Sequence, residues 1–215
     1  MSSNNRKSLH FTRFMTLRIF SSTPSTPAAV LACCLFFSRA VVATTVTPLD
    51  LPDLVEKADL IADATVTNSE VYLAPANGNN SIHTRVTFTL NAAPLKGQVS
   101  SPFTLNFLGG TLGSKRLVVG GMPQLNVGQR VILFTHTPNA TYVSPIIGFN
   151  QGILKVVHDD QSNTDRVFRW SGAAVNESTP FISKPASGSN TQAEAAANAE
   201  TVDHFMQRVK QLVNP

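Results

Sequence analysis

The chain has 215 residues, of which 42% are hydrophobic and 14% are charged. This length and composition fit one globular domain with extensions, and they exclude a multidomain machine and a chain that is disordered throughout. The formal net charge of +4 arises in the N-terminal segment, because five of the 17 bases and none of the 13 acids precede Thr44. Twelve bases and 13 acids follow, so the remaining chain is nearly neutral. Its charge gives no reason to expect a nucleic acid as partner.

Residues 1–43 have the pattern of a signal peptide. Basic residues are scattered through the first 18 positions, ten uncharged apolar residues run from Ala28 to Phe37, and the stretch ending at Ala43 suits a signal peptidase. We expect cleavage after Ala43 and a periplasmic or extracellular protein with no remaining membrane segment. The apolar run is shorter than the roughly 20 residues of a spanning helix, so a retained anchor is the less favoured alternative.

Both cysteines, Cys33 and Cys34, lie inside the apolar run of this leader. The expected mature chain therefore contains no thiol, which excludes a disulfide framework, a thiolate metal site and a cysteine nucleophile. Val30-Leu31-Ala32-Cys33 faintly resembles a lipoprotein box, and a lipidated Cys33 is a second alternative. Either route gives an exported protein.

The mature chain begins with a predicted helix over residues 50–58, in which Asp50 can cap the first turn and Pro52 needs no hydrogen bond. Strands are expected at 60–67 and 71–73. The next segment, Ala74 to Ser81, is rich in turn residues and predicts an exposed, mobile loop. Its candidate interaction residues are Ala74, Pro75, Asn77, Gly78, Asn79 and Asn80.

A strict alternation of apolar and polar residues predicts a strand over 82–90. Further strands are expected at 103–108, 116–119, 130–135, 146–157 and 166–170. Gly148 and Gly152 would bend the long strand at 146–157, as a small barrel requires. The predicted class is mainly β, with residues 44–171 forming a small curled antiparallel sheet or an OB-like barrel.

Residues 172–190 are rich in Ser, Pro, Gly and Asn and predict a covering loop. A C-terminal amphipathic helix is expected over 191–215, because Thr191 and Glu194 have capping-box spacing and an apolar stripe follows. The stripe would pack on the sheet. Docking to a partner is the alternative.

The glycine clusters around 109–113 and 120–121 are not followed by the strand-to-helix passage of a dinucleotide site. We expect tight corners with positive φ instead. The glycines assigned a structural role are Gly109, Gly110, Gly113, Gly120, Gly121, Gly148 and Gly152.

No strong catalytic motif occurs in the chain, and no catalytic, metal-binding or cofactor-binding residue is assigned. His83, His136, His158 and His204 are too far apart in sequence to form a local metal site. Residues 159–165 have calcium-loop spacing at their start, but Thr164 stands where the loop needs glycine, which favours a hairpin tip.

Three segments resemble a group of exported bacterial proteins: Leu108-Gly109-Gly110, the stretch from Val119 to Phe134 with its Gly-x-Pro, and the stretch from Gly148 to Val156 with its Gln-Gly. Gln129 stands where that group usually has an acid. Some members accompany secreted matrixin-type metalloproteases, so the resemblance implies export and a link to a secreted protease. More remotely, the order of elements is similar to the OB barrel of netrin-like and metalloprotease-inhibitor domains.

The expected function is that of an exported, non-enzymatic binding module. Its partner would be an extracytoplasmic protein or a surface polymer, recognised by the loop at 74–81 and the glycine corners. The alternative is a small hydrolase that uses either a metal held by the dispersed histidines with Asp159 or Asp160, or Ser144 as nucleophile. A purely structural role in the envelope also remains open.

Overall fold

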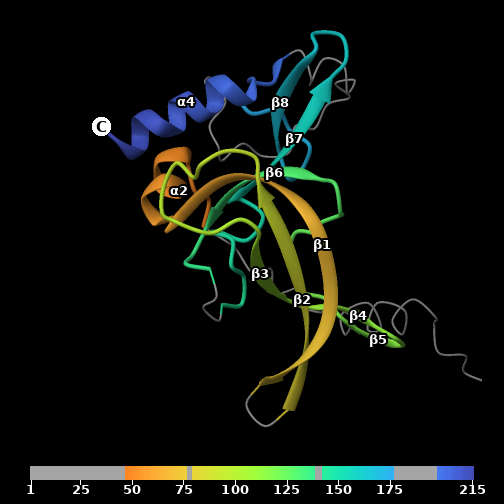
Figure 1. Cartoon of the computed structure of the whole chain (residues 1–215). Helices are drawn as coiled ribbons and strands as arrows, with labels where there is room; N and C mark the ends of the chain where they lie inside the picture. The colour runs from red at the N-terminus through yellow and green to blue at the C-terminus, as the bar shows by residue number, and fades with distance from the viewer. Residues whose placement is uncertain (1–46, 77–78, 139–141, 177–197) are drawn as a thin grey trace, which may run out of the picture. The chain divides into compact units, whose positions relative to one another are not determined.

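The computed structural model describes residues 47–76, 79–138, 142–176 and 198–215, and these ranges contain two helices and eight strands (Figure 1). The mainly β class predicted from the sequence is confirmed. In chain order the elements are α2 (Leu51–Lys57), β1 (Leu60–Ala76), β2 (Asn79–Leu90), β3 (Phe103–Leu108), β4 (Gly110–Leu112), β5 (Lys115–Leu117), β6 (Arg130–Thr135), β7 (Ile153–Asp159), β8 (Thr164–Arg169) and α4 (Val202–Val213).

Six strands form one antiparallel sheet in the order β3-β2-β1-β6-β7-β8, and β4 pairs with β5 in a separate hairpin. The predicted antiparallel sheet is confirmed, but among the described residues it does not close into the barrel that was its alternative. The edge strand β8 is covered by the chain itself, through bridges from Arg166 to Thr201 and from Phe168 to Ala174. This edge is therefore occupied without closure onto β3.

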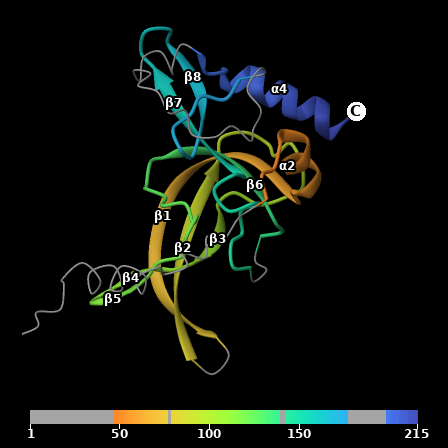
Figure 2. The same cartoon turned by 180° about the vertical axis from the view of Figure 1, so that it is seen from behind.

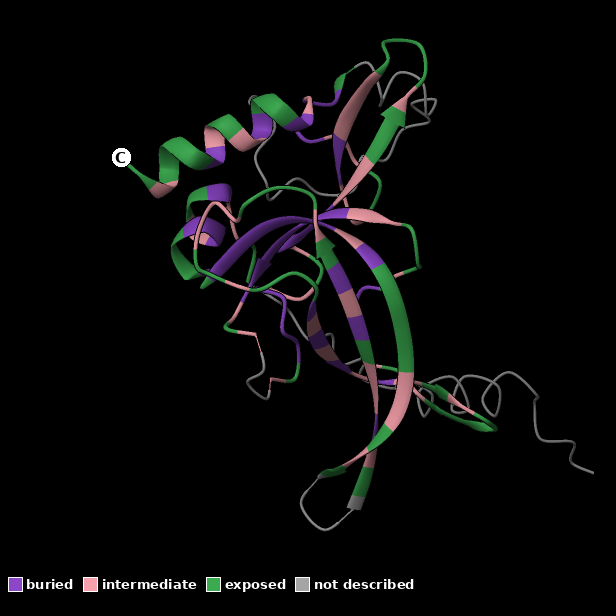
Figure 3. Cartoon of the chain, viewed as in Figure 1, coloured by how far each residue is buried: buried purple, intermediate pink, exposed green. Residues whose placement is uncertain are grey.

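Both faces of the sheet are buried where β1 and β6 pair (Figure 3). On one face Ile61, Ile132 and Phe134 pack with α2 and α4. On the other face Leu60, Ala62 and Leu133 pack with residues of β2, β3 and β7. This explains why β6 is a continuous apolar run without alternation, which is typical of a strand buried on both sides.

Helix α2 forms as its sequence predicts. Asp50 accepts a hydrogen bond from the Asp53 amide at 2.8 Å, and Asp53 accepts one from the Asp50 amide at 3.1 Å. Gln151 fixes the chain just before the helix, because its side chain accepts from the Leu49 amide and donates to the Thr47 carbonyl. Seen from behind, α2 and α4 lie beside each other next to β6 (Figure 2).

The C-terminal helix is shorter than the 191–215 predicted. Residues 199–201 are not helical, because Glu200 pairs with Val175 and Val167 through backbone hydrogen bonds and Thr201 bridges to Arg166. Thr201 then caps α4. The proposed capping box at Thr191 and the loop at 177–190 lie outside the described residues. None of the described helices combines the length and hydrophobicity that crossing a membrane requires.

The expected loop at 74–81 is largely strand. Ala74 pairs with Ser81 and Pro75 with Asn80, so only Asn77 and Gly78, which lie outside the described residues, separate β1 from β2. Turn-forming residues are tolerated here because β1 pairs with β6 only as far as Thr65, which leaves its outer part an edge strand.

The predicted strand at 146–157 is also wrong in its first half, since β7 begins at Ile153. Gly148 adopts φ +61° in a turn. Gly152 ends that turn, with its amide donating to the Ile147 carbonyl and its carbonyl accepting from the Phe134 amide. These glycines form a tight turn beside β6 and do not bend a continuous strand.

The two glycines at 152 and 120 give a matched test of this packing. A Cβ at Gly152 would lie 2.5 Å from the Ile147 carbonyl oxygen and 2.9 Å from that of Phe134, and backbone atoms cannot easily yield. We expect Gly152→Ala to lower the free energy of unfolding by about 1–3 kcal/mol in urea titrations. Gly120→Ala meets nothing within 4 Å and should change it by less than ~0.5 kcal/mol. Equal effects of the two substitutions would contradict the turn geometry.

Candidate functional site

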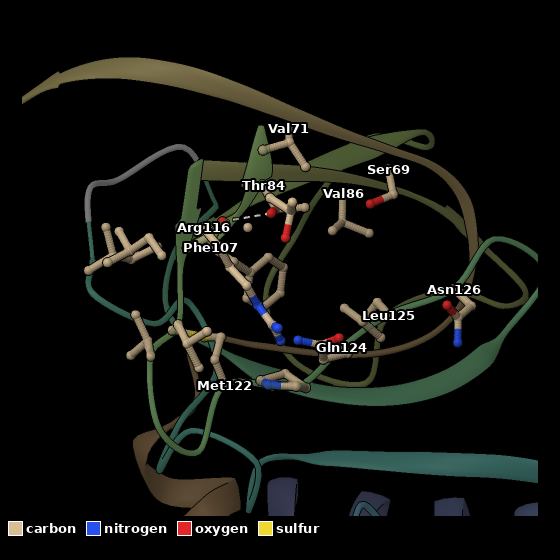
Figure 4. Close-up of a pocket in the computed structure, with 18 residues that line it drawn as sticks. Ser69, Val71, Thr84, Val86, Phe107, Arg116, Met122, Gln124, Leu125 and Asn126 are labelled. Carbon is tan, nitrogen blue, oxygen red and sulfur yellow. Dashed lines mark hydrogen bonds between the residues drawn. The ribbon is translucent and has the colours of Figure 1, made fainter. Parts of the chain in front are cut away.

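A pocket of about 250 Å³ lies between strands β1, β2 and β3 and the chain from Gly109 to Asn126 (Figure 4). Its apolar lining is continuous with the core, because Val86 and Phe107 belong to the buried cluster and Met122 and Leu125 pack against that cluster. Pockets for small molecules commonly measure about 300–1,000 Å³. This one has room for a small ligand or for one group of a larger ligand.

A register shift in β1 gives the pocket its wall. Leu60, Ala62, Ala64 and Val66 all face the interior, so simple alternation would place residues 68 and 70 there next. A bulge between Val66 and Asn68 inserts one extra residue, which turns Ser69 and Val71 inward instead. Val71 then lies opposite Thr84, and Ser69 opposite Val86.

The glycine pair at 109 and 110 brings the hairpin of β4 and β5 against the sheet. Gly109 and Gly110 have φ values of +107° and +141°, and the Gly109 carbonyl accepts a hydrogen bond from the Thr84 hydroxyl at 2.7 Å. A Cβ at Gly110 would lie 2.7 Å from that hydroxyl oxygen and 2.9 Å from a methyl of Val71. Only glycine permits this close approach, which forms one side of the pocket.

Arg116 is the single charged residue among those lining the pocket. It lies on β5 opposite Thr111, and it makes no hydrogen bond or ion pair with any described residue. The described residues that line the pocket include no acid. In Figure 4 the side chains of Arg116 and Gln124 both point into it. The pocket therefore combines an apolar floor with a positive charge that no described residue pairs with.

The sequence predicted part of this site. Gly109 and Gly110 line the pocket, and Gly121 (φ +78°) lies next to its lining residue Met122. Gly113 forms the turn of the β4–β5 hairpin with φ +59°. None of the described residues at 74–81 lines the pocket. Arg116, Ser69 and Thr84 were missed, because their convergence depends on the bulge and on the hairpin's approach.

The four histidines of the expected mature chain do not meet. His83 lies beside Tyr72 with ring centroids 5.9 Å apart, and His136 stacks on Tyr142 at 4.4 Å. His204 pairs with Glu200 at 2.8 Å. Across the described ranges, no three His, Cys, Asp or Glu side chains are grouped as a metal site requires.

Ser144 has its hydroxyl engaged in local structure. The side chain is buried, donates to the Ile146 carbonyl at 3.1 Å and accepts from the Ile146 amide at 3.2 Å.

The carboxylate of Asp159 is also hydrogen-bonded within the fold. It accepts from Ser162 and Arg166, and its pKa is lowered chiefly by the Ser162 hydrogen bond. Asp159 pairs with Thr164 at the β7–β8 hairpin, where residues 160–163 form the tip.

A chain of charged side chains crosses the sheet from β1 to β8. Arg130 donates to the buried Asp63 at 2.6 Å and to Asp165 at 2.5 Å, and its pKa is raised chiefly by the Asp63 hydrogen bond. Asp165 also lies 2.8 Å from Nδ1 of His158. That contact lowers the pKa of Asp165 and raises the pKa of His158. These groups are mutually paired and serve the structure.

The raised pKa of His158 predicts a pH dependence of stability. Protonated His158 stabilises the folded protein fully below its ordinary value of 6.5, and this contribution is lost as pH rises through the higher folded pKa. We expect the melting temperature of the wild-type protein to fall relative to that of His158→Gln as the pH rises above 6.5. The effect is modest because the side chain is half exposed. Identical pH profiles of the two proteins would contradict the His158–Asp165 pair.

No protein-family model matches the chain, and no curated protein matches it either. The resemblance of the segments at 108–156 to exported bacterial proteins therefore stays a prediction, as does the remote similarity to netrin-like domains.

Proposed function

We propose that the protein is an exported, non-enzymatic binding module that holds a group of an extracytoplasmic partner in the pocket at Gly109–Asn126. The observation that carries the proposal is the combination of an apolar floor with polar side chains that have no structural role of their own. Arg116 is the clearest case: it is exposed and pairs with no described residue, whereas the partly buried Arg130 and Arg166 have carboxylate partners.

The rigidity of the site supports this role. Its floor lies on the well-packed pairing of β1, β2 and β3, and its glycine wall is tied to β2 by the Thr84 hydrogen bond. A preformed pocket loses little conformational entropy on binding. The partner would be a secreted protein or a surface polymer, and the resemblance to companions of secreted metalloproteases favours the protein.

Filling the pocket tests the proposal. Ser69 faces the pocket, whereas its neighbour Asn68 is exposed on the opposite face of β1, so Ser69→Trp and Asn68→Trp form a matched pair. We expect Ser69→Trp to reduce retention of a partner from the native extracytoplasmic fraction by about tenfold or more, and Asn68→Trp to retain it. Cross-linking with quantitative mass spectrometry measures this. Retention that is equal for both variants would refute a pocket-based binding role.

Export gives a separate prediction. We expect N-terminal sequencing of the extracytoplasmic form to begin at Thr44, because the small residue at 43 suits signal peptidase. Ala43→Phe should slow processing and leave a larger species at the membrane. A mature form that starts at Cys33 would support lipidation, and one that starts at Met1 would contradict cleavage.

A further inference from the structure

The charge at the pocket restricts the chemistry of what it binds. Arg116 is exposed, it is the single charged residue among the described residues that line the pocket, and none of these residues has a carboxylate that could neutralise it. A guanidinium forms two parallel hydrogen bonds with a carboxylate, which adds geometric specificity to charge attraction. An anionic ligand group is therefore favoured over a neutral or cationic one.

The neutral polar groups at the rim point to more than a lone carboxylate. Ser69, Thr111 and Gln124 line the pocket, and none of their side chains is hydrogen-bonded to another described residue. Together they offer hydroxyl and amide groups that can donate and accept. A fatty acid would leave most of them unused, whereas the amides of a peptide chain would pair with them.

The pocket is large enough for one apolar side chain with its carboxylate. Its volume of about 250 Å³ lies just below the ~300–1,000 Å³ that is common for small-molecule sites. The apolar residues that would receive the side chain are Val86, Phe107, Met122 and Leu125.

We infer that the pocket binds the C-terminal residue of an extended peptide, with its apolar side chain on Phe107 and Leu125 and its carboxylate on Arg116. The preceding peptide amides would lie along Gln124, Ser69 and Thr111. This inference rests on the proposed binding function and gives its partner a chemical identity: a protein that ends in an exposed apolar residue with a free carboxylate.

The test uses the peptide N-acetyl-Ala-Ala-Leu with a free carboxylate, its C-terminal amide, and octanoate. Binding to the purified full chain is followed by ¹H–¹⁵N NMR titration, which reports both affinity and location. We expect the acid to shift the amides of Thr84, Val86 and Phe107, and the C-terminal amide to bind at least about tenfold more weakly. Octanoate should bind more weakly than the peptide acid.

Variants of β5 test whether the effect comes from the positive charge that lines the pocket or from any positive charge on this strand. Arg116→Gln should abolish the difference between acid and amide, while Arg116→Lys should restore part of it. Lys115→Gln removes the same charge from an adjacent exposed residue that does not line the pocket, and it should preserve the difference. Equal sensitivity of the two glutamine variants would overturn the role assigned to Arg116.

The remaining outcomes are distinguishable. Equal binding of acid and amide would overturn the carboxylate inference, yet loss of partner retention in Ser69→Trp would still support the pocket as a binding site. Octanoate binding that is tighter than peptide binding and depends on Arg116 would identify a fatty acid and refute the peptide. If no probe shifts the pocket residues and Ser69→Trp retains the partner, both proposals fail.

Discussion

The pocket depends on one extra residue in β1. The bulge between Val66 and Asn68 reverses the side-chain alternation of a 17-residue strand. On the pocket side of the sheet, its first half therefore places even-numbered residues and its second half odd-numbered residues. The chain before β6 fixes this point, because Val66 exchanges backbone hydrogen bonds with Gly128 and Gln129. Without the shift, Glu70 and Tyr72 would face the interior in place of Val71.

The arginines of the protein differ in whether their charge is paired with a carboxylate of the described residues. Near β6 to β8, Arg130 and Arg166 are each paired with carboxylates, and near α4 Arg208 is paired with the buried Glu200. Leaving one partner of such a pair buried alone would be costly, so these contacts are structural requirements. Arg116 is different, because it is solvent-exposed and its removal leaves no buried charge behind. This contrast separates residues that maintain the fold from one that is available to a ligand.

Regular strands were predictable from sequence where a local pattern determines them. The bounds of β3 and β6 agree with the prediction, and the alternation over 82–90 lies within β2, because apolar periodicity directly reflects which face is buried.

The predictions were wrong where tertiary contacts override local preference. Pro75 and Asn80 are turn-forming residues, yet they pair with each other across β1 and β2. The apolar residues at 146–147 resemble a strand, but the turn at Gly148 and Gly152 interrupts it. The site was less predictable, since no local pattern reveals that Arg116 pairs with none of the described residues.

The outer part of the hairpin formed by β1 and β2 contacts little else. From Ala74 to Ala76 and from Asn79 to Ser81, the two strands pair with each other, and no other described strand pairs with them. Residues of an antiparallel pair lie opposite each other one to one, so adding or removing one residue on each strand beside the tip leaves the pairing nearer the bulge unchanged. The length of this arm is therefore independent of the register that places Ser69 and Val71 at the pocket.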